Sequence, residues 1–584
     1  MLKTLLMSVL SILFSAVLSP GLAIAQQARE QPPNVLLIIT DDQGYGDIGA
    51  HGNPMIQTPQ LDSLARQSIR FTNFHVDPTC AETRSALMTG RYSCRVGVWH
   101  TVMGRSILRR DETTMAQAFA SGGYRTGMFG KWHLGDNWPY RPHDRGFQQT
   151  LYHGGGGVGQ TPDFWGNDYF DDTFFRQGRP EPQQGYCTDV WFREATRFIE
   201  ANKDQRFFCY LATNAPHSPY NVDAKYSRPY VEKGVPDAMA NFYGMIANID
   251  ENIGRLLGKL DELQLSDNTI VIFMTDNGSA AGVARNRSTK TDSWQGFSAG
   301  MREMKGSQYE GGHRVPCWIR WPGGKWTSNR EVAQLAAHFD LFPTLMELCN
   351  LPLSQAEKPF DGQSLVPLLR GVESAADRKL VVHSQRVDHP QKWRKCAVMT
   401  QQWRLVDGSE LYDLPQDPGQ ERDVAKAHQS VVQELRAFYE TWWSTVSKRF
   451  DEYVSIPLGA EEANPTTLNC MDWHAPLASI PWSQSNIAGN PDAEANGVWA
   501  IEVTQQGRYE FTLRSRPAGV SHQMKAGEAR LRVGDVEGKA PITDGADSAK
   551  IVIELKAGQS KLQTWLKEQG RGARGAFFVD VKRL

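Results

Sequence analysis

The segment VLLIITDD, residues 35–42, is a continuous apolar, β-branched run that ends at two aspartates. A run of this length without polar alternation predicts a strand buried on both faces, as in a parallel sheet. Apolar runs at 207–213 and 270–275 have the same character, and a long helical pattern covers 238–263. Strands that alternate with helices predict an α/β fold with a mostly parallel or mixed central sheet covered by helices.

Polar side chains follow two of these strands directly. Asp41 and Asp42 end the first run, and Asp276 and Asn277 follow the run at 270–275. Ligands of such sheets bind beyond the carboxyl ends of the strands. Carboxylate and amide oxygens suit Ca²⁺ or Mg²⁺ rather than zinc or copper. A single aspartate after a strand is usually a turn or cap residue, but two such clusters favour a metal site.

The segment CAETRSALMTGR, residues 80–91, places a sulfur at the start of a predicted helix. Residues 80, 84, 87 and 91 share one face of that helix. The first turn of a helix offers unpaired N–H groups and a partial positive charge. Cys80 with Arg84 one turn on is therefore suited to a tetrahedral oxyanion such as sulfate or phosphate. The alternative is a buried cysteine beside a surface arginine.

Three further basic segments supply candidate groups for proton transfer and anion binding. Lys131 and His133 flank a tryptophan at the end of a predicted strand at 124–132. His217 follows the strand at 207–213, and Lys305 precedes a glycine-rich turn. Lysine and histidine together can bind an anion and move a proton, although isolated pairs of this kind are usually only solvated. The glycine run at 154–157 lacks the residues of a nucleotide loop, and we interpret it as a loop beside the active site.

Length and composition indicate an exported protein of several domains. The 584 residues carry a net charge of −2, which gives no sign of a nucleic-acid partner. Residues 1–25 have the basic start, apolar run and small-residue cleavage site of a signal peptide, with a retained membrane anchor as the alternative. We expect a periplasmic or secreted protein with no membrane span after cleavage. The eight cysteines include no CxxC pair, which argues against a zinc knuckle and leaves one or two disulfides open.

The chain divides into a predicted catalytic α/β domain at 33–375, a smaller α+β unit with antiparallel strands at 376–450, and an all-β, sandwich-like module at 455–584. Alternating apolar and polar residues at 499–503, 509–513 and 551–555 predict the half-buried strands of that module. Its aromatic residues either stack on sugars or pack in the core, and core packing is the favoured interpretation; they are Trp473, Trp482, Trp499 and Tyr509.

Residues 33–450 resemble the sulfatase family, within the alkaline phosphatase superfamily. The resemblance begins with Cys80, Arg84 and the Thr89-Gly90-Arg91 triplet. It extends in order over the other blocks at 41–44, 130–135, 216–217, 275–278, 305–316 and 410–418. One residue departs from the family pattern: Glu82 stands where the family usually has proline or alanine, which puts the maturation of Cys80 at risk.

The resemblance implies an arylsulfatase-like hydrolase of sulfate esters. It implies that a formylglycine-generating enzyme converts Cys80 to formylglycine, whose hydrated aldehyde attacks the ester sulfur. It implies one Ca²⁺, with Mg²⁺ less expected, held by Asp41, Asp42, Cys80, Asp276 and Asn277. The implied catalytic residues are Cys80, Arg84, Lys131, His133, His217 and Lys305, with His133 accepting a proton from the diol and His217 protonating the leaving oxygen.

Two other functions remain open at this point. Phosphoester and phosphonate hydrolases of the same superfamily tend to carry histidine where Asn277 stands. A catalytically weak, glycan-binding relative is the second alternative if Cys80 is not converted. The added β module makes a sulfated glycan or polysaccharide fragment the expected natural substrate, with aryl sulfates as probes. We expect the loops at 153–186 and 285–304 to carry the sugar subsites.

Overall fold

The computed structural model describes residues 32–283, 296–352, 358–372, 378–490 and 494–584. The predicted signal peptide and most of the loop at 285–304 lie outside the described residues. Among the described helices, none is both long and apolar enough to cross a bilayer.

A mixed ten-stranded sheet forms the centre of the region after residue 32, with strand order β11-β2-β10-β9-β1-β8-β4-β5-β6-β7. Its middle is parallel: β1 pairs with β8 and β9, and β4 pairs with β8 and β5. The strands, in chain order, are β1 (Asn34–Thr40), β2 (Ile69–Phe71), β4 (Arg125–Lys131), β5 (Gln149–His153), β6 (Thr173–Arg176), β7 (Arg179–Pro182), β8 (Phe207–Ala212), β9 (Thr269–Thr275), β10 (Cys317–Arg320) and β11 (Arg330–Val332).

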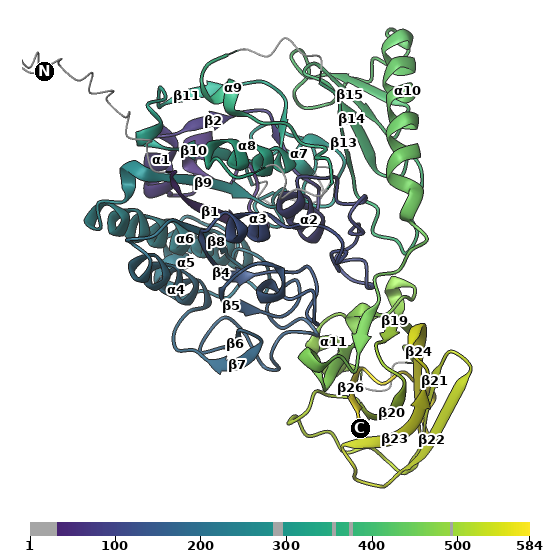
Figure 1. Cartoon of the computed structure of the whole chain (residues 1–584). Coiled ribbons are helices and arrows are strands. Elements are labelled where there is room, and N and C mark those ends of the chain that lie inside the picture. The colour runs from purple at the N-terminus through teal and green to yellow at the C-terminus, as the bar shows by residue number, and fades with distance from the viewer. Residues whose placement is uncertain (1–31, 284–295, 353–357, 373–377, 491–493) are drawn as a thin grey trace, which may run out of the picture. The chain divides into compact units, whose positions relative to one another are not determined.

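Helices cover both faces of this sheet, which explains the uninterrupted apolar run of β1 (Figure 1). Val35, Leu37 and Ile39 pack into one hydrophobic cluster, whereas Leu36 and Ile38 pack into another. The first cluster includes α2 (Cys80–Thr89), α3 (Met115–Ser121) and α8 (Leu341–Leu348); the second includes α1 (Pro59–Arg66), α4 (Cys187–Ala201) and α6 (Asp237–Glu262). The α/β fold class expected from the apolar runs is confirmed.

A smaller antiparallel sheet follows, with the order β13-β14-β15-β16, and the long helix α10 (Gln429–Val446) packs against it. The strands are β13 (Leu380–His383), β14 (Cys396–Met399), β15 (Trp403–Val406) and β16 (Glu410–Asp413). The antiparallel sheet predicted for this part of the chain is therefore present.

The C-terminal β module, residues 456–583, consists of two sheets around one hydrophobic cluster. One sheet has the order β17-β19-β24-β21-β22 and the other β18-β26-β20-β23. The longer strands are β19 (Val498–Val503), β20 (Gly507–Arg514), β21 (Gly527–Val533), β22 (Val536–Ile542), β23 (Ser548–Leu555), β24 (Gly558–Glu568) and β26 (Phe578–Arg583), and the shorter ones are β17 (Ile456–Leu458) and β18 (Thr466–Asn469). This is the β-sandwich expected from the alternating segments, whereas the domain boundaries themselves stay predictions.

Two expectations about side chains have definite outcomes. Trp473, Trp499 and Tyr509 are core residues, but Trp482 is 44% exposed. All eight cysteines are buried free thiols. The one or two disulfides that an exported protein could form are therefore not present in the structure.

Candidate active site

Four parallel strands end at one edge of the sheet and bring the predicted polar residues together. In the order β9-β1-β8-β4, β9 and β1 lead directly into Asp276 and Asp41, β8 is followed by the loop of His217, and β4 ends at Lys131. Parallel strands place their carboxyl ends at the same edge. The N-terminus of α2 adds Cys80, which is 2% exposed. Two backbone hydrogen bonds bring Lys305 to the same place. Lys305 N–H donates to the Ser279 carbonyl (3.2 Å), and Gly306 N–H donates to the Pro78 carbonyl (2.9 Å).

Three buried carboxylates are each paired with one cation. The Arg84 guanidinium donates from Nη2 (2.8 Å) and Nε (3.1 Å) to Oδ2 of Asp276. Lys131 Nζ lies 2.6 Å from Asp41 Oδ2, and Lys305 Nζ lies 2.5 Å from Asp42 Oδ1. Burying a charge without a partner is costly. The sequence neighbours of each residue give no indication of which cation pairs with which carboxylate.

Unused oxygen atoms in this cluster fit a hard divalent cation. Asp41 Oδ1 and Asn277 Oδ1 are buried and have no hydrogen-bond partner among the described residues. One ligand atom each from Asp41, Cys80 and Asp276 lies within 4.8 Å of the other two. Buried polar atoms are normally satisfied, and carboxylate and amide oxygens are the ligands that Ca²⁺ prefers. The donor set therefore suits the Ca²⁺ that the family resemblance implied.

The pKa values of the aspartates follow from these partners. Burial and the nearby Asp276 raise the pKa of Asp41 well above its usual value. Burial also acts to raise the pKa of Asp42, but Lys305 and His217 outweigh it and hold that pKa below the usual range. In the same way, Arg84 overcomes burial and lowers the pKa of Asp276. A divalent cation on the free oxygen of Asp41 would favour its ionised form.

The hydrogen bonds of His133 leave one ring nitrogen facing Cys80. His133 Nε2 lies 2.9 Å from the carbonyl oxygen of Thr101, which can only accept, so Nε2 carries the hydrogen. The lone pair of Nδ1 then points at Cys80 Sγ, 3.4 Å away. Burial, followed by Lys131, lowers the pKa of His133 well below its usual value, so the ring is neutral and the Nδ1 lone pair that faces Cys80 is unprotonated. The sequence did not predict the contact with Thr101, because every residue type carries a backbone carbonyl.

His217 has the complementary arrangement. Its Nδ1 lies 2.7 Å from the Ser218 carbonyl oxygen and therefore carries the hydrogen. Its Nε2 is directed at the carboxylate of Asp42, 3.6 Å from Oδ2. Burial lowers the pKa of His217 to about 4, against the opposing effect of Asp42.

Local backbone geometry at this edge is unusual. Asp42 and His133 have φ values of 68° and 62°, a region that non-glycine residues rarely adopt. The loop at 154–157 lies against the two histidines: a Cβ on Gly156 would come within 2.3 Å of His133 Cε1, and one on Gly157 within 2.8 Å of His217 Cε1. The glycine run therefore lies beside the active site, as expected, and its lack of side chains makes room for both rings.

The helical prediction for 80–91 was wrong in its last turn. Helix α2 ends at Thr89, because Gly90 takes a left-handed conformation with φ 68°. Arg91 lies beyond the helix and pairs with Glu112 at 2.8 Å, away from the Cys80 face. Burial raises the pKa of the Cys80 thiol, which keeps it protonated and a poor nucleophile as an unmodified cysteine.

Glu82 is 1% exposed, and both of its carboxylate oxygens lack a hydrogen-bond partner among the described residues. Burial raises its pKa from the ordinary value of 4.5 to about 7. The folded protein therefore binds this proton more tightly than the unfolded chain, and stability falls as the pH rises from about 4.5 to about 7.

We expect Glu82→Gln to remove this pH dependence. At about 1.4 kcal/mol per pKa unit, ionised Glu82 costs about 3 kcal/mol of unfolding free energy above pH ~7. Urea unfolding of both proteins at several pH values measures the difference. The stability advantage of the variant should grow by that amount between pH ~4.5 and ~8. Parallel pH profiles for the two proteins would contradict the assignment.

Comparison with known proteins identifies the class. The family model described as Sulfatase matches residues 33–351, and that described as N-sulphoglucosamine sulphohydrolase, C-terminal, matches 304–441. Arylsulfatase A from Homo sapiens is 31% identical over 474 residues, which is 72% of this chain and 88% of the relative. N-acetylgalactosamine-6-sulfatase from Canis lupus familiaris is 30% identical over 369 residues, 58% of this chain and 66% of the relative.

Comparison with solved structures supports the same class of protein. The crystal structure of Ps i-CgsB in complex with k-i-k-neocarrahexaose has a TM-score of 0.63 at 27% identity, and the match covers 73% of this chain and 95% of that one. The phosphonate monoester hydrolase of Agrobacterium radiobacter shares the fold at a TM-score of 0.53 and 21% identity. The chain belongs to the sulfatase family, of alkaline-phosphatase-like fold. It is a sulfatase, an enzyme that hydrolyses sulfate esters.

Proposed function

We propose that this sulfatase acts through formylglycine made from Cys80 and one Ca²⁺, and that its natural substrate is a sulfated glycan fragment. The observation that carries the proposal is the contact between Cys80 Sγ and the lone pair of His133 Nδ1, 3.4 Å apart, beside the unused oxygens of Asp41 and Asn277. A buried, protonated thiol has little use there, whereas a hydroxyl at the same position has a base at hand.

The residues of the site have distinct tasks in this proposal. Asp41, Asp42, Asp276 and Asn277 would hold the cation, which when bound supplies positive charge that stabilises developing negative charge. One hydroxyl of the hydrated aldehyde at position 80 attacks the ester sulfur as the alcohol leaves, and the second hydroxyl then expels sulfate and restores the aldehyde. His133 Nδ1 accepts a proton from this diol, and the Thr101 carbonyl holds the ring in the required tautomer. Lys131 and Lys305 neutralise the sulfate oxygens. Arg84 keeps Asp276 ionised and in position.

Protonation of the leaving oxygen is the task of His217. Its Nδ1–H is fixed on Ser218, so only Nε2 is free to carry the proton that is donated. The negative charge of a bound sulfate favours the protonated ring. Release of a sugar hydroxyl needs this proton, because a sugar alkoxide is a poor leaving group, whereas para-nitrophenolate leaves unaided.

We therefore expect His217→Gln to act selectively. It should lower kcat on a sulfated sugar by about 10²–10⁴-fold and kcat on para-nitrophenyl sulfate much less. Steady-state kinetics on both substrates, with His143→Gln as a control outside the site, measure this difference. Equal losses on the two substrates would assign His217 to sulfate binding instead.

A glycan is the favoured substrate class because several relatives bear names of that chemistry. They include N-acetylgalactosamine-6-sulfatase and the structure that contains k-i-k-neocarrahexaose. The neutral amide of Asn277, in place of histidine, favours a single-cation sulfatase over a phosphonate hydrolase. The proposal also includes export to the periplasm or beyond, and maturation by a formylglycine-generating enzyme.

Mass spectrometry of the peptide that contains Cys80, after co-expression with a formylglycine-generating enzyme, tests the first part. The mass should change as CH₂SH is replaced by CHO, and bound calcium should be found by elemental analysis. A screen of sulfated mono- and disaccharides, with a phenylphosphonate ester alongside, tests the substrate class. An intact thiol with no bound Ca²⁺ or Mg²⁺, or turnover of the phosphonate alone, would overturn the proposal.

A further inference from the structure

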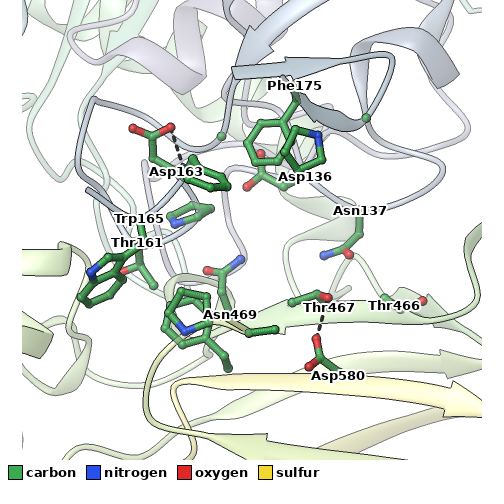
Figure 2. A pocket seen from close by; sticks show the side chains of 18 of the residues that line it. Asp136, Asn137, Thr161, Asp163, Trp165, Phe175, Thr466, Thr467, Asn469 and Asp580 are labelled. Carbon is green, nitrogen blue, oxygen red and sulfur yellow. Dashed lines mark hydrogen bonds between the residues drawn. The ribbon is translucent and has the colours of Figure 1, made fainter. Parts of the chain in front are cut away.

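We propose that a cavity between the 136–180 segment and the C-terminal β module binds the uncharged, hydroxyl-rich part of an oligosaccharide. The cavity has a volume of about 690 Å³, which is in the range of ligand sites. Figure 2 shows Asp136, Asn137 and Phe175 on one side and Thr466, Thr467 and Asn469 on the other. The site therefore needs both parts of the chain.

The lining joins aromatic faces with hydrogen-bonding groups. Trp138 and Phe175 are half-buried in it and Phe164 is 40% exposed, whereas the guanidinium of Arg516 covers one face of Trp165, 4.6 Å from the ring centroid. Rings that are neither fully buried nor fully exposed can stack on the C–H faces of sugars. Within the described part of the chain, the Asn137 amide and the Trp138 indole N–H have no protein hydrogen-bond partner, so both are available to sugar hydroxyls.

The lining of the cavity offers no free cation to a sulfate group. Its one cation among the described residues, Arg141, is held by Asp144 at 2.7 Å. Of its acidic groups, Asp580 is paired with Arg514 at 3.2 Å, and burial raises the pKa of Asp163 well above its usual value and the pKa of Asp136 to about 6. A sulfate group would therefore gain no ion pair here, whereas carboxyl oxygens accept hydrogen bonds from hydroxyls. The cavity therefore suits the unsulfated residues of a chain, while the sulfated residue occupies the site at Cys80.

One short loop separates the cavity from the catalytic histidines. Gly154 lines the cavity, and Gly155 N–H bonds to Asp136 Oδ1 at 3.3 Å. The next two residues of the loop contact His133 and His217, as described above. The same glycine loop therefore borders both the cavity and the catalytic histidines.

The C-terminal β module braces this region. Gln484 Nε2 donates to the carbonyl oxygens of Gln160 (3.1 Å), Asp163 (3.0 Å) and Phe164 (3.2 Å). Thr161 Oγ1 donates to the Pro481 carbonyl at 2.7 Å. These bonds order the aromatic segment 161–165 before any ligand arrives, which lowers the entropic cost of binding.

Calorimetric titration of the inactive Cys80→Ala protein tests the binding itself. The probes are the neutral hexasaccharides cellohexaose, mannohexaose, xylohexaose and neoagarohexaose. We expect at least one to bind saturably, and Trp138→Ala and Asn137→Ala to weaken its binding about tenfold. Trp482→Ala is the matched control, because Trp482 is exposed but does not line the cavity. Absence of binding by all four probes, or equal binding by all variants, would overturn the inference.

Steady-state kinetics, which rest on the proposed function, test whether the cavity contributes to substrate binding during the reaction. In the active enzyme, Trp138→Ala should raise KM about tenfold for a sulfated hexasaccharide substrate and leave kcat/KM for para-nitrophenyl sulfate unchanged. Asn137→Ala removes no packed ring. A rise in KM in this variant as well would show that the effect of Trp138→Ala does not come from misfolding. Failure of the enzyme to release sulfate from any substrate would overturn the proposed function. Normal sulfate release with an unchanged KM for the sulfated hexasaccharide in Trp138→Ala would overturn this inference alone.

Discussion

Cys80→Ala is expected to lower kcat for sulfate-ester hydrolysis by at least about 10⁴-fold while the protein stays folded. Among the described residues, the one hydrogen-bonding contact of Sγ is with His133, and the side chain occupies the first position of α2, where alanine is well tolerated. The variant therefore loses the group from which the nucleophile is made and little else. Sulfate release and thermal unfolding, measured together, separate the two effects.

Cys209→Ala is the matched control for this experiment. Cys209 is also a fully buried free thiol, but it lies within β8 and is not part of the site. The control should lose some stability, because it leaves a cavity in the core, and should keep its activity. Retained activity in Cys80→Ala would remove residue 80 from the mechanism.

Asp276→Asn is expected to remove calcium binding and activity together. The Arg84 guanidinium makes two hydrogen bonds to one oxygen of this carboxylate, and the Asp42 N–H donates to the other at 3.1 Å. The amide leaves Arg84 without its counter-charge in a fully buried position, which should cost about 3–5 kcal/mol. It also withdraws a charged ligand from the proposed cation. We expect kcat/KM to fall by at least about 10³-fold.

Thermal unfolding with and without Ca²⁺ measures the metal part of this prediction. The wild-type protein should gain about 2.7 kcal/mol at a Ca²⁺ concentration 100 times Kd, and the variant should gain nothing. Asp340→Asn is the control, since Asp340 forms a comparable buried pair with Arg378 at 2.5 Å outside the site. It should be destabilised but still respond to Ca²⁺. An equal response in Asp276→Asn would refute Asp276 as a ligand.

The fold and the main site residues could be predicted from the sequence, because they depend on local patterns. The apolar run of β1 specifies a strand buried on both faces, and Asp41 and Asp42 must then lie where it ends. The sequence segments that resemble the sulfatase family include the same residues. The prediction was weaker at the end of this helix: Gly90 ends α2 two residues earlier than predicted and removes Arg91 from the Cys80 face.

What the tertiary structure decided is how distant residues meet. Lys305 contacts Asp42, Arg84 contacts Asp276, and the Thr101 carbonyl holds His133 towards Cys80. The members of each pair lie many residues apart, and no property of one indicates its distance from the other. The neutral-sugar cavity depends even more on the folded chain, since two segments separated by about three hundred residues form its walls. Local sequence determines secondary structure through side-chain periodicity, but only packing in three dimensions brings separate charges, lone pairs and aromatic faces to a common site.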